Sequence, residues 1–113
     1  MKIIFDNSTP APLAAFLIGH EIKMCPKLGW ARLGNGELLT AAEAAGFELM
    51  ISADQSLKYQ QNLTERSIAL IVLGSNDWSI VRNYAAVVAA CADAATPNSY
   101  VFIEMPTSGR ARK

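Results

Sequence analysis

Residues 68–73 read Ile-Ala-Leu-Ile-Val-Leu, a continuously apolar run that begins soon after Arg66 and stops at Gly74. A run of this length, bounded in this way, is typical of a β-strand that is buried on both of its faces. Strands covered on both faces occur almost only where helices pack against the two sides of a parallel sheet. This stretch therefore predicts an α/β domain.

Strand-like and helical patterns alternate along the rest of the chain. Short apolar runs predict further strands at residues 2–6, 21–25, 47–52 and 100–104. The segments between them predict helices near residues 10–18, 37–45, 57–63 and 77–96. This alternation predicts a three-layer α/β/α sandwich with a mostly parallel sheet of about five strands. We expect one domain at residues 1–106 and a flexible C-terminal tail at residues 107–113.

Composition narrows the class of protein. The chain has 113 residues, of which 51% are hydrophobic and 18% charged, so it can build a core without disulfides. Ten basic and ten acidic residues give zero net charge, which argues against a protein that mainly coats nucleic acid. Cys25 and Cys91 lie far apart without a C-x-x-C pattern, which argues against a zinc site. With no apolar run long enough for a membrane span, we expect a cytoplasmic protein.

Three acids are expected at the carboxyl edge of the sheet. Asp6 follows the first strand, Asp54 follows the third, and Glu37 opens the helix whose N-terminus faces the same edge. Ligands of open parallel sheets bind beyond this edge, near the point where strand order reverses. If the first and third strands are neighbours, the carboxylates converge and repel one another, and a hard divalent cation relieves that repulsion. Asp6, Glu37 and Asp54 are therefore candidate catalytic and metal-ligating residues for Mg²⁺ or Mn²⁺.

Each of these acids also has an ordinary structural explanation. An Asp at a strand end is frequently a turn former or a helix cap, and a Glu in a first helical turn complements the helix dipole. His20 is the single histidine and begins a strand, where a hydrogen-bonded structural role suits it better than catalysis. We expect Trp30 and Trp78 to pack at the rim of the core or in an interface.

Four short motifs give the chain a resemblance to a known family. They are Ile3-Ile4-Phe5-Asp6-Asn7, Gly19-His20-Glu21-Ile22, Asn35-Gly36-Glu37-Leu38-Leu39 and Ile51-Ser52-Ala53-Asp54-Gln55. Across roughly residues 2–73, the chain resembles the short bacterial PIN-like domains, relatives of the VapC toxin ribonucleases. That family binds metal through an Asp after the first strand, an acid at a helix start and the Asp of a T-x-D segment. The resemblance assigns these roles to Asp6, Glu37 and Asp54.

The resemblance implies a metal-dependent, toxin-like nuclease that hydrolyses phosphodiester bonds of single-stranded RNA. It also implies an antitoxin protein that covers the cleft, and the apolar last helix suits a homodimer. The chain departs from the family in lacking an acid on an intervening helix. Ser56 stands where a further acid is frequent, and Ser52 replaces the usual Thr. These departures keep open a second hypothesis, a catalytically inactive PIN-like fold that binds protein or RNA.

Residues shortly after Asp54 are candidates for substrate binding. Tyr59 can stack on an unpaired base, the amides of Gln61 and Asn62 can hydrogen-bond base edges, and Lys58 can contact a phosphate. An exposed polar helix rim explains the same four residues without a ligand.

Two other α/β classes fit the sequence less well. A phosphoryl-accepting receiver domain needs paired acids after the first strand and a Lys after the last, whereas Asn7 follows Asp6 and Met105-Pro106 follows Glu104. A dinucleotide-binding domain needs a G-x-G-x-x-G turn, which follows none of the expected strands.

Overall fold

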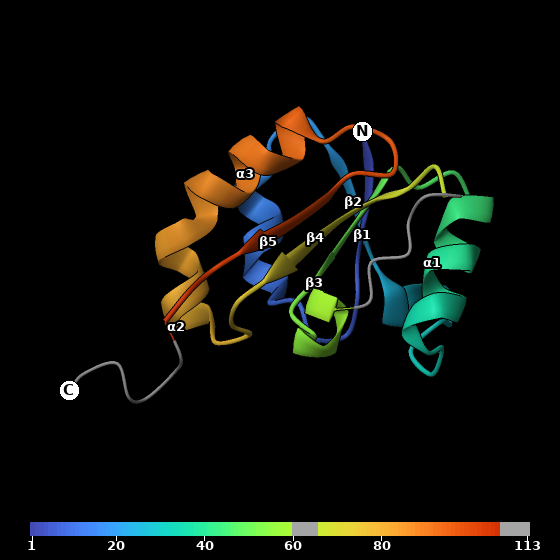
Figure 1. Ribbon diagram of the computed structural model, residues 1–113, viewed down its shortest axis with the longest axis horizontal. Helices are drawn as coiled ribbons and strands as arrows, with labels where there is room; N and C mark the ends of the chain where they lie inside the picture. The colour runs from blue at the N-terminus through green and yellow to red at the C-terminus, as the bar shows by residue number, and fades with distance from the viewer. Residues whose placement is uncertain (60–65, 107–113) are drawn as a thin grey trace.

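A five-stranded, fully parallel sheet forms the middle layer of the protein (Figure 1). The computed structural model describes residues 1–59 and 66–106, without the side chains of Lys58 and Tyr59. The strands are β1 (Lys2–Phe5), β2 (Glu21–Met24), β3 (Leu49–Ser52), β4 (Ala69–Leu73) and β5 (Tyr100–Ile103). Helices cover both faces, so the predicted three-layer α/β/α sandwich is confirmed.

The strands lie side by side in the order β2-β1-β3-β4-β5. This is the flavodoxin-type doubly wound order, in which the chain first adds a strand on one side of β1 and then continues on the other side. In the register, Ile4 of β1 lies between Lys23 of β2 and Met50 of β3. The strand order therefore reverses between β1 and β3, which is where a ligand is expected in such a sheet.

Burial differs between inner and edge strands. Every residue of β3 and β4 is buried, and so are Ile3, Ile4 and Phe5 of β1. The edge strands β2 and β5 alternate between more and less exposed positions, because successive side chains of a strand point to opposite faces of the sheet. The sequence predicts strands that are covered on both faces, and the burial of β1, β3 and β4 confirms this for the three inner strands.

Two core clusters fill the space above and below the sheet. One face carries the 3₁₀ helix η1 (Ala11–Phe16) and a continuous helical run made of α2 (Trp78–Val81), η4 (Arg82–Tyr84) and α3 (Ala85–Ala94). The other face carries α1 (Asn35–Ala44) and the 3₁₀ helices η2 (Cys25–Leu28) and η3 (Gln55–Tyr59). Figure 1 shows α3 and α1 on opposite sides of the sheet.

Local structure departs from the predicted elements in three places. The segment expected as a helix at residues 10–18 forms the shorter 3₁₀ helix Ala11–Phe16, at whose end the amide of Leu17 donates to the carbonyl of Ala14 (3.2 Å), two residues before Gly19 (φ +89°). Phe47 does not begin β3, because its amide donates to the carbonyl of Ala42 (2.9 Å) and closes α1 instead. The short helix expected at 57–63 overlaps η3 (Gln55–Tyr59) at residues 57–59. Residues 60–65 lie outside the described part, as does the expected tail at 107–113.

Candidate functional site

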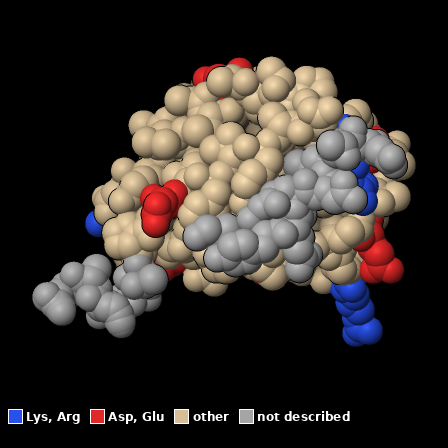
Figure 2. All heavy atoms as spheres, viewed as in Figure 1, with Lys and Arg blue, Asp and Glu red and all other residues tan. Residues whose placement is uncertain are grey.

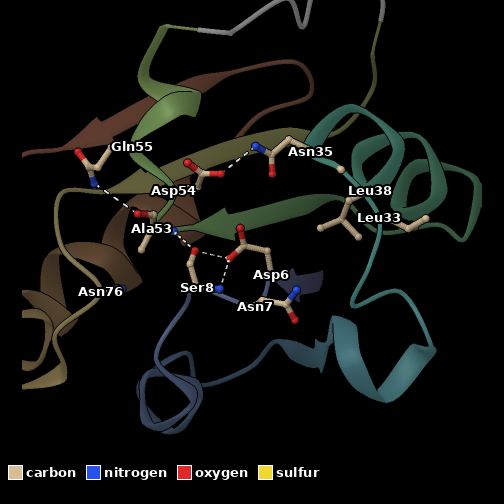
Figure 3. Close-up of a pocket in the computed structure, with 11 residues that line it drawn as sticks. Asp6, Asn7, Ser8, Leu33, Asn35, Leu38, Ala53, Asp54, Gln55 and Asn76 are labelled. Atoms are coloured by element: carbon tan, nitrogen blue, oxygen red, sulfur yellow. Dashed lines mark hydrogen bonds between the residues drawn. The ribbon is translucent and has the colours of Figure 1, made fainter.

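A polar cavity of about 550 Å³ opens at the carboxyl edge of the sheet, beyond the ends of β1 and β3 (Figure 3). Among the described residues that line it, Asp6 and Asp54 are the ones that carry charge. The structure thus brings these two acids together at the switch point, as the sequence predicts, while their chemical role stays a prediction. The remaining lining residues are Asn7, Ser8, Leu33, Gly34, Asn35, Leu38, Ala53, Gln55 and Asn76.

Asp6 is held by a dense set of hydrogen bonds and is only 8% exposed. Its Oδ1 accepts from the amide (3.1 Å) and the hydroxyl (2.7 Å) of Ser8. The Thr9 hydroxyl shares one proton between Asp6 Oδ1 (2.9 Å) and the carbonyl of Ile51 (2.7 Å). Ser52 donates its hydroxyl to Oδ2. These donors compensate the burial of the carboxylate and fix its orientation.

Asp54 is half-buried on the opposite side of the same cavity. Its Oδ2 accepts from the side-chain amide of Asn35 (2.9 Å), which comes from the first turn of α1. Its Oδ1 accepts from the amide (3.0 Å) and hydroxyl (2.8 Å) of Ser56. The Asn35 hydrogen bond, followed by those of Ser56, holds the pKa of Asp54 below its ordinary value. Asp54 is therefore negatively charged at neutral pH.

The turns after β1, β3 and β4 share one motif, Asp-x-Ser. In each, Oδ1 of the Asp accepts from both the backbone amide and the hydroxyl of the Ser two residues later. This is an Asx-turn, which satisfies amides that a strand end leaves unpaired. The Asp-x-Ser spacing is visible in the sequence, but it is recognised only when the three acids are compared with one another. The three copies are Asp6-x-Ser8, Asp54-x-Ser56 and Asp77-x-Ser79.

Ser52 connects the two acidic turns. Its side chain has no exposed surface, donates to Asp6 and accepts the backbone amide of Asp54 (3.0 Å). A second link runs from the amide of Ala53 to the hydroxyl of Ser8 (2.9 Å). The last residue of β3 therefore links the carboxylate of Asp6 to the backbone of the turn that carries Asp54.

Glu37 lies apart from this cavity and does not line it. Its Oε1 accepts the backbone amide of Gly34 (3.0 Å), which is the residue before α1. This contact satisfies an amide at the helix start and is the glutamate half of a capping box. The structure therefore gives Glu37 the helix-capping contact, and a metal-ligating role for it stays a prediction.

The other predicted residues divide into two groups. The side chains of Lys58 and Tyr59, and the whole of Gln61 and Asn62, lie outside the described part of the chain, so their substrate-binding role stays a prediction. His20 contacts the amine of Met1 through Nδ1 (3.0 Å) and Asp93 through Nε2 (2.6 Å). It thus has the hydrogen-bonded role expected from the sequence, away from the cavity.

Sequence reasoning did not single out four amide side chains on the cavity lining, those of Asn7, Asn35, Gln55 and Asn76. Asn7 donates to the carbonyl of Ala31 (2.7 Å) and accepts a hydrogen bond from the thiol of Cys25 (3.4 Å). Burial first, and the charge of Asp6 second, raise the pKa of the Cys25 thiol. The thiol is therefore neutral and acts as a hydrogen-bond donor. It is not poised as a nucleophile.

The donor set of the cavity suits one kind of cation. In residues 1–59 and 66–106, no three His, Cys, Asp or Glu side chains converge as a metal cage. The cavity instead offers two carboxylates and several amide oxygens, all of them hard ligands. Mg²⁺ is usually held by one or two carboxylates, with water and substrate phosphates completing the shell. Asp6 and Asp54 fit such a sparsely ligated Mg²⁺ or Mn²⁺ better than a fully caged ion.

No protein-family model matches the chain, and no curated protein or solved structure is significantly similar to it. Within the described residues, no helix has the length and apolar character that a membrane crossing requires.

Proposed function

We propose that this protein is a PIN-like, Mg²⁺- or Mn²⁺-dependent ribonuclease that acts in the cytoplasm. The observation that carries the proposal is the pairing of Asp6 and Asp54 on one cavity at the switch point of the sheet. Two carboxylates that share a cavity repel each other, and no Lys or Arg of the described residues lines it to offset them. Such a cavity attracts a cation and repels a bare phosphodiester. A cation is therefore what would let this cavity accept RNA.

The roles of the chain's own residues follow from their positions. Asp54 is ionised and half-buried, so its outer lone pairs can face a cation, while Asp6 lies deeper with fewer lone pairs to spare. Asn35 and Asn76 can donate their amides to phosphate oxygens or to base edges of a single strand. A bound divalent cation would supply Lewis acidity and lower the pKa of water. In the toxin-like form of this proposal, an antitoxin protein covers the cavity.

A second candidate is a catalytically inactive PIN-like module that binds protein or RNA. The observation that favours it is the number of hydrogen bonds that the two carboxylates already accept from donors within the chain. Asp6 accepts from Ser8, Thr9 and Ser52, and Asp54 accepts from Asn35 and Ser56. On this reading, the acids hold the loops together and need no cation.

Titration of the protein with Mn²⁺ by calorimetry separates the two candidates. We expect saturable binding that Asp54→Asn weakens about tenfold or more, because the cation loses a charged ligand. Asp54→Asn is a mild change, since an amide oxygen can still accept from Ser56 and an amide NH₂ can donate to a turned Asn35 side chain. Asp6→Asn is less suitable. It would point an NH₂ group at buried donors and cost stability.

Asp77→Asn is the matched control, because Asp77 has the same Asp-x-Ser turn but does not line the cavity. It should bind Mn²⁺ like the unaltered protein. The variant Glu37→Gln tests whether Glu37 holds the cation through a water molecule. If it does, this variant should bind Mn²⁺ more weakly. Absence of saturable binding at millimolar Mn²⁺ would reject the metal site and leave the inactive module.

Cleavage of a labelled single-stranded RNA in the presence of Mn²⁺ tests the activity itself. The unaltered protein should cut it, and Asp54→Asn should reduce cutting to the level seen with a chelator. An Asp54→Asn protein that cuts at the original rate would remove Asp54 from the active site.

A further inference from the structure

The helix α3 is apolar on nearly all of its sides. Its sequence is Ala-Ala-Val-Val-Ala-Ala-Cys-Ala-Asp-Ala, and Asp93 is its one charged residue. Ala85, Val88 and Ala92 pack against the sheet, while Ala86, Val87 and Ala90 face outward. Val87 is 47% exposed. A helix that is hydrophobic all round is normally buried on all sides, so the outer face of α3 lacks the cover that its composition predicts.

A groove runs along this outer face. It has a volume of about 560 Å³ and lies between α3 and the end of η1, where Phe16 is 46% exposed. Its walls are mostly small, with Ala86, Ala89 and Ala90 on one side. Figure 2 shows that the surface over α3 is mostly uncharged. Small side chains let a second helix approach closely, at an interaxial distance of about 8 Å.

One basic and one acidic residue lie at opposite ends of the groove. Arg82 and Asp93 both line it, and they lie on the continuous helical run from Trp78 to Ala94. At a rise of about 1.5 Å per residue, they are roughly 16 Å apart along the axis. Within the described residues Arg82 has no ion-pair partner, and Asp93 is bound by His20 alone. A basic and an acidic residue at opposite ends form a self-complementary pattern.

We infer that the outer face of α3, with Phe16 beside it, is a two-fold interface with a second copy of this chain. When two α3 helices pack antiparallel, Arg82 of each copy lies opposite Asp93 of the other, as a two-fold axis requires. Along the groove, the axis then falls between Ala86 and Ala89, whose small side chains let the two helices approach closely at the centre. A single antiparallel register forms both ion pairs and the apolar centre. This geometry is that of a two-fold dimer.

A membrane surface fits this face less well. Helices that lie on membranes carry large apolar side chains and several basic residues on the polar face, whereas this groove carries alanines and a balanced Arg82 and Asp93. The groove shares no lining residue with the cavity of Asp6 and Asp54, so the dimer is independent of the proposed nuclease function.

Analytical ultracentrifugation of the full chain tests the interface. We expect the dimer mass for the unaltered protein and the monomer mass for Ala90→Glu, because two carboxylates would be buried near the axis. Ala44→Glu is the matched control, since Ala44 is an exposed alanine on α1 and should leave the dimer intact. Circular dichroism would check that each variant is folded.

Charge reversal tests the register. Arg82→Asp and Asp93→Arg should each weaken the homodimer about tenfold to a hundredfold, since two attractive pairs become repulsive. An equimolar mixture of the two single variants should recover the dimer, because each repulsive pair becomes attractive in the heterodimer. The double variant Arg82→Asp/Asp93→Arg should also dimerise.

Four results would overturn the inference. A monomer mass at about 100 µM would remove the interface. A dimer that survives Ala90→Glu, or a mixture that fails to recover association, would place any contact elsewhere. A monomer that sediments with phosphatidylcholine–phosphatidylserine vesicles, and loses this through Ala90→Glu, would assign the face to a membrane instead.

Discussion

Ser52 ends β3 with no exposed surface and makes two hydrogen bonds at once, one to Asp6 and one from the amide of Asp54. Ser8 makes the corresponding link from the β1 side. Hydroxyl groups are suited to this task because each can donate to a carboxylate and accept from an amide. The hydroxyl groups of Ser8 and Ser52 therefore connect the two turns that carry Asp6 and Asp54.

The substitution Ser52→Ala should lower the free energy of unfolding by about 2 kcal/mol, because a buried carboxylate loses a donor and a half-buried amide loses its acceptor. Urea denaturation followed by circular dichroism measures this. Ser56→Ala is the control, since Ser56 is exposed and water can replace its hydroxyl. It should cost less than about 1 kcal/mol. Equal losses in the two variants would contradict the role of Ser52.

At the scale of elements, Gly74 and Gly36 differ in how closely the backbone around them is packed. Gly74 directly follows β4 and donates its amide to Ile103 at the end of β5 (2.9 Å). A Cβ atom at Gly74 would lie 2.6 Å from the backbone nitrogen of Met105 and 2.9 Å from the carbonyl oxygen of Ile103. Gly36 lies in the first turn of α1, where a Cβ would meet nothing within 4 Å. Gly74 therefore permits a close approach of two backbone segments, whereas Gly36 makes no such close approach.

The substitution Gly74→Ala should therefore lower the free energy of unfolding by about 3 kcal/mol, because the obstacle is backbone and has to shift. Gly36→Ala should raise it by about 0.5 to 1 kcal/mol, since alanine is the better helix former. Thermal unfolding of both variants makes the comparison. A Gly74→Ala protein as stable as the original would show that the end of β5 does not pack as described.

At the scale of the whole molecule, one carboxylate ties a helical layer to the sheet. Glu43 of α1 accepts hydrogen bonds from the amide and the hydroxyl of Ser67, and pairs with Arg66 at 3.4 Å. Both partners precede β4. The hydrogen bond from the Ser67 amide, with a smaller contribution from Arg66, holds the pKa of Glu43 below its ordinary value.

A group whose pKa is lower in the folded state stabilises the fold above its unfolded pKa, near 4.3 for Glu. That contribution is lost as the pH falls through the folded pKa. Glu43→Gln should therefore cost about 1 kcal/mol at pH 7 and progressively less below about pH 4. Urea denaturation at pH 7 and pH 3 measures the difference. A cost that does not change between these pH values would mean that the ionised carboxylate is not what holds α1 to the sheet.

The amino-acid sequence by itself determined the strands, the alternation with helices and the position of Asp6 and Asp54 at strand ends. These features are local. A buried strand needs a short apolar run, and a residue that ends a strand can be recognised from its immediate neighbours. Because all parallel strands end at the same edge, that much was enough to predict one acidic edge. It was also enough to predict the three-layer sandwich.

Only the tertiary structure decided which residues share the cavity. Asn35 reaches Asp54 from another layer, and Asn76 comes from the loop after β4. Glu37 looked equivalent to the other acids in the sequence, yet its carboxylate accepts the Gly34 amide at the start of α1. Periodicity tells which face of an element is buried but not which neighbour covers it. The neighbour is chosen by packing between segments far apart in the chain, which no local pattern encodes.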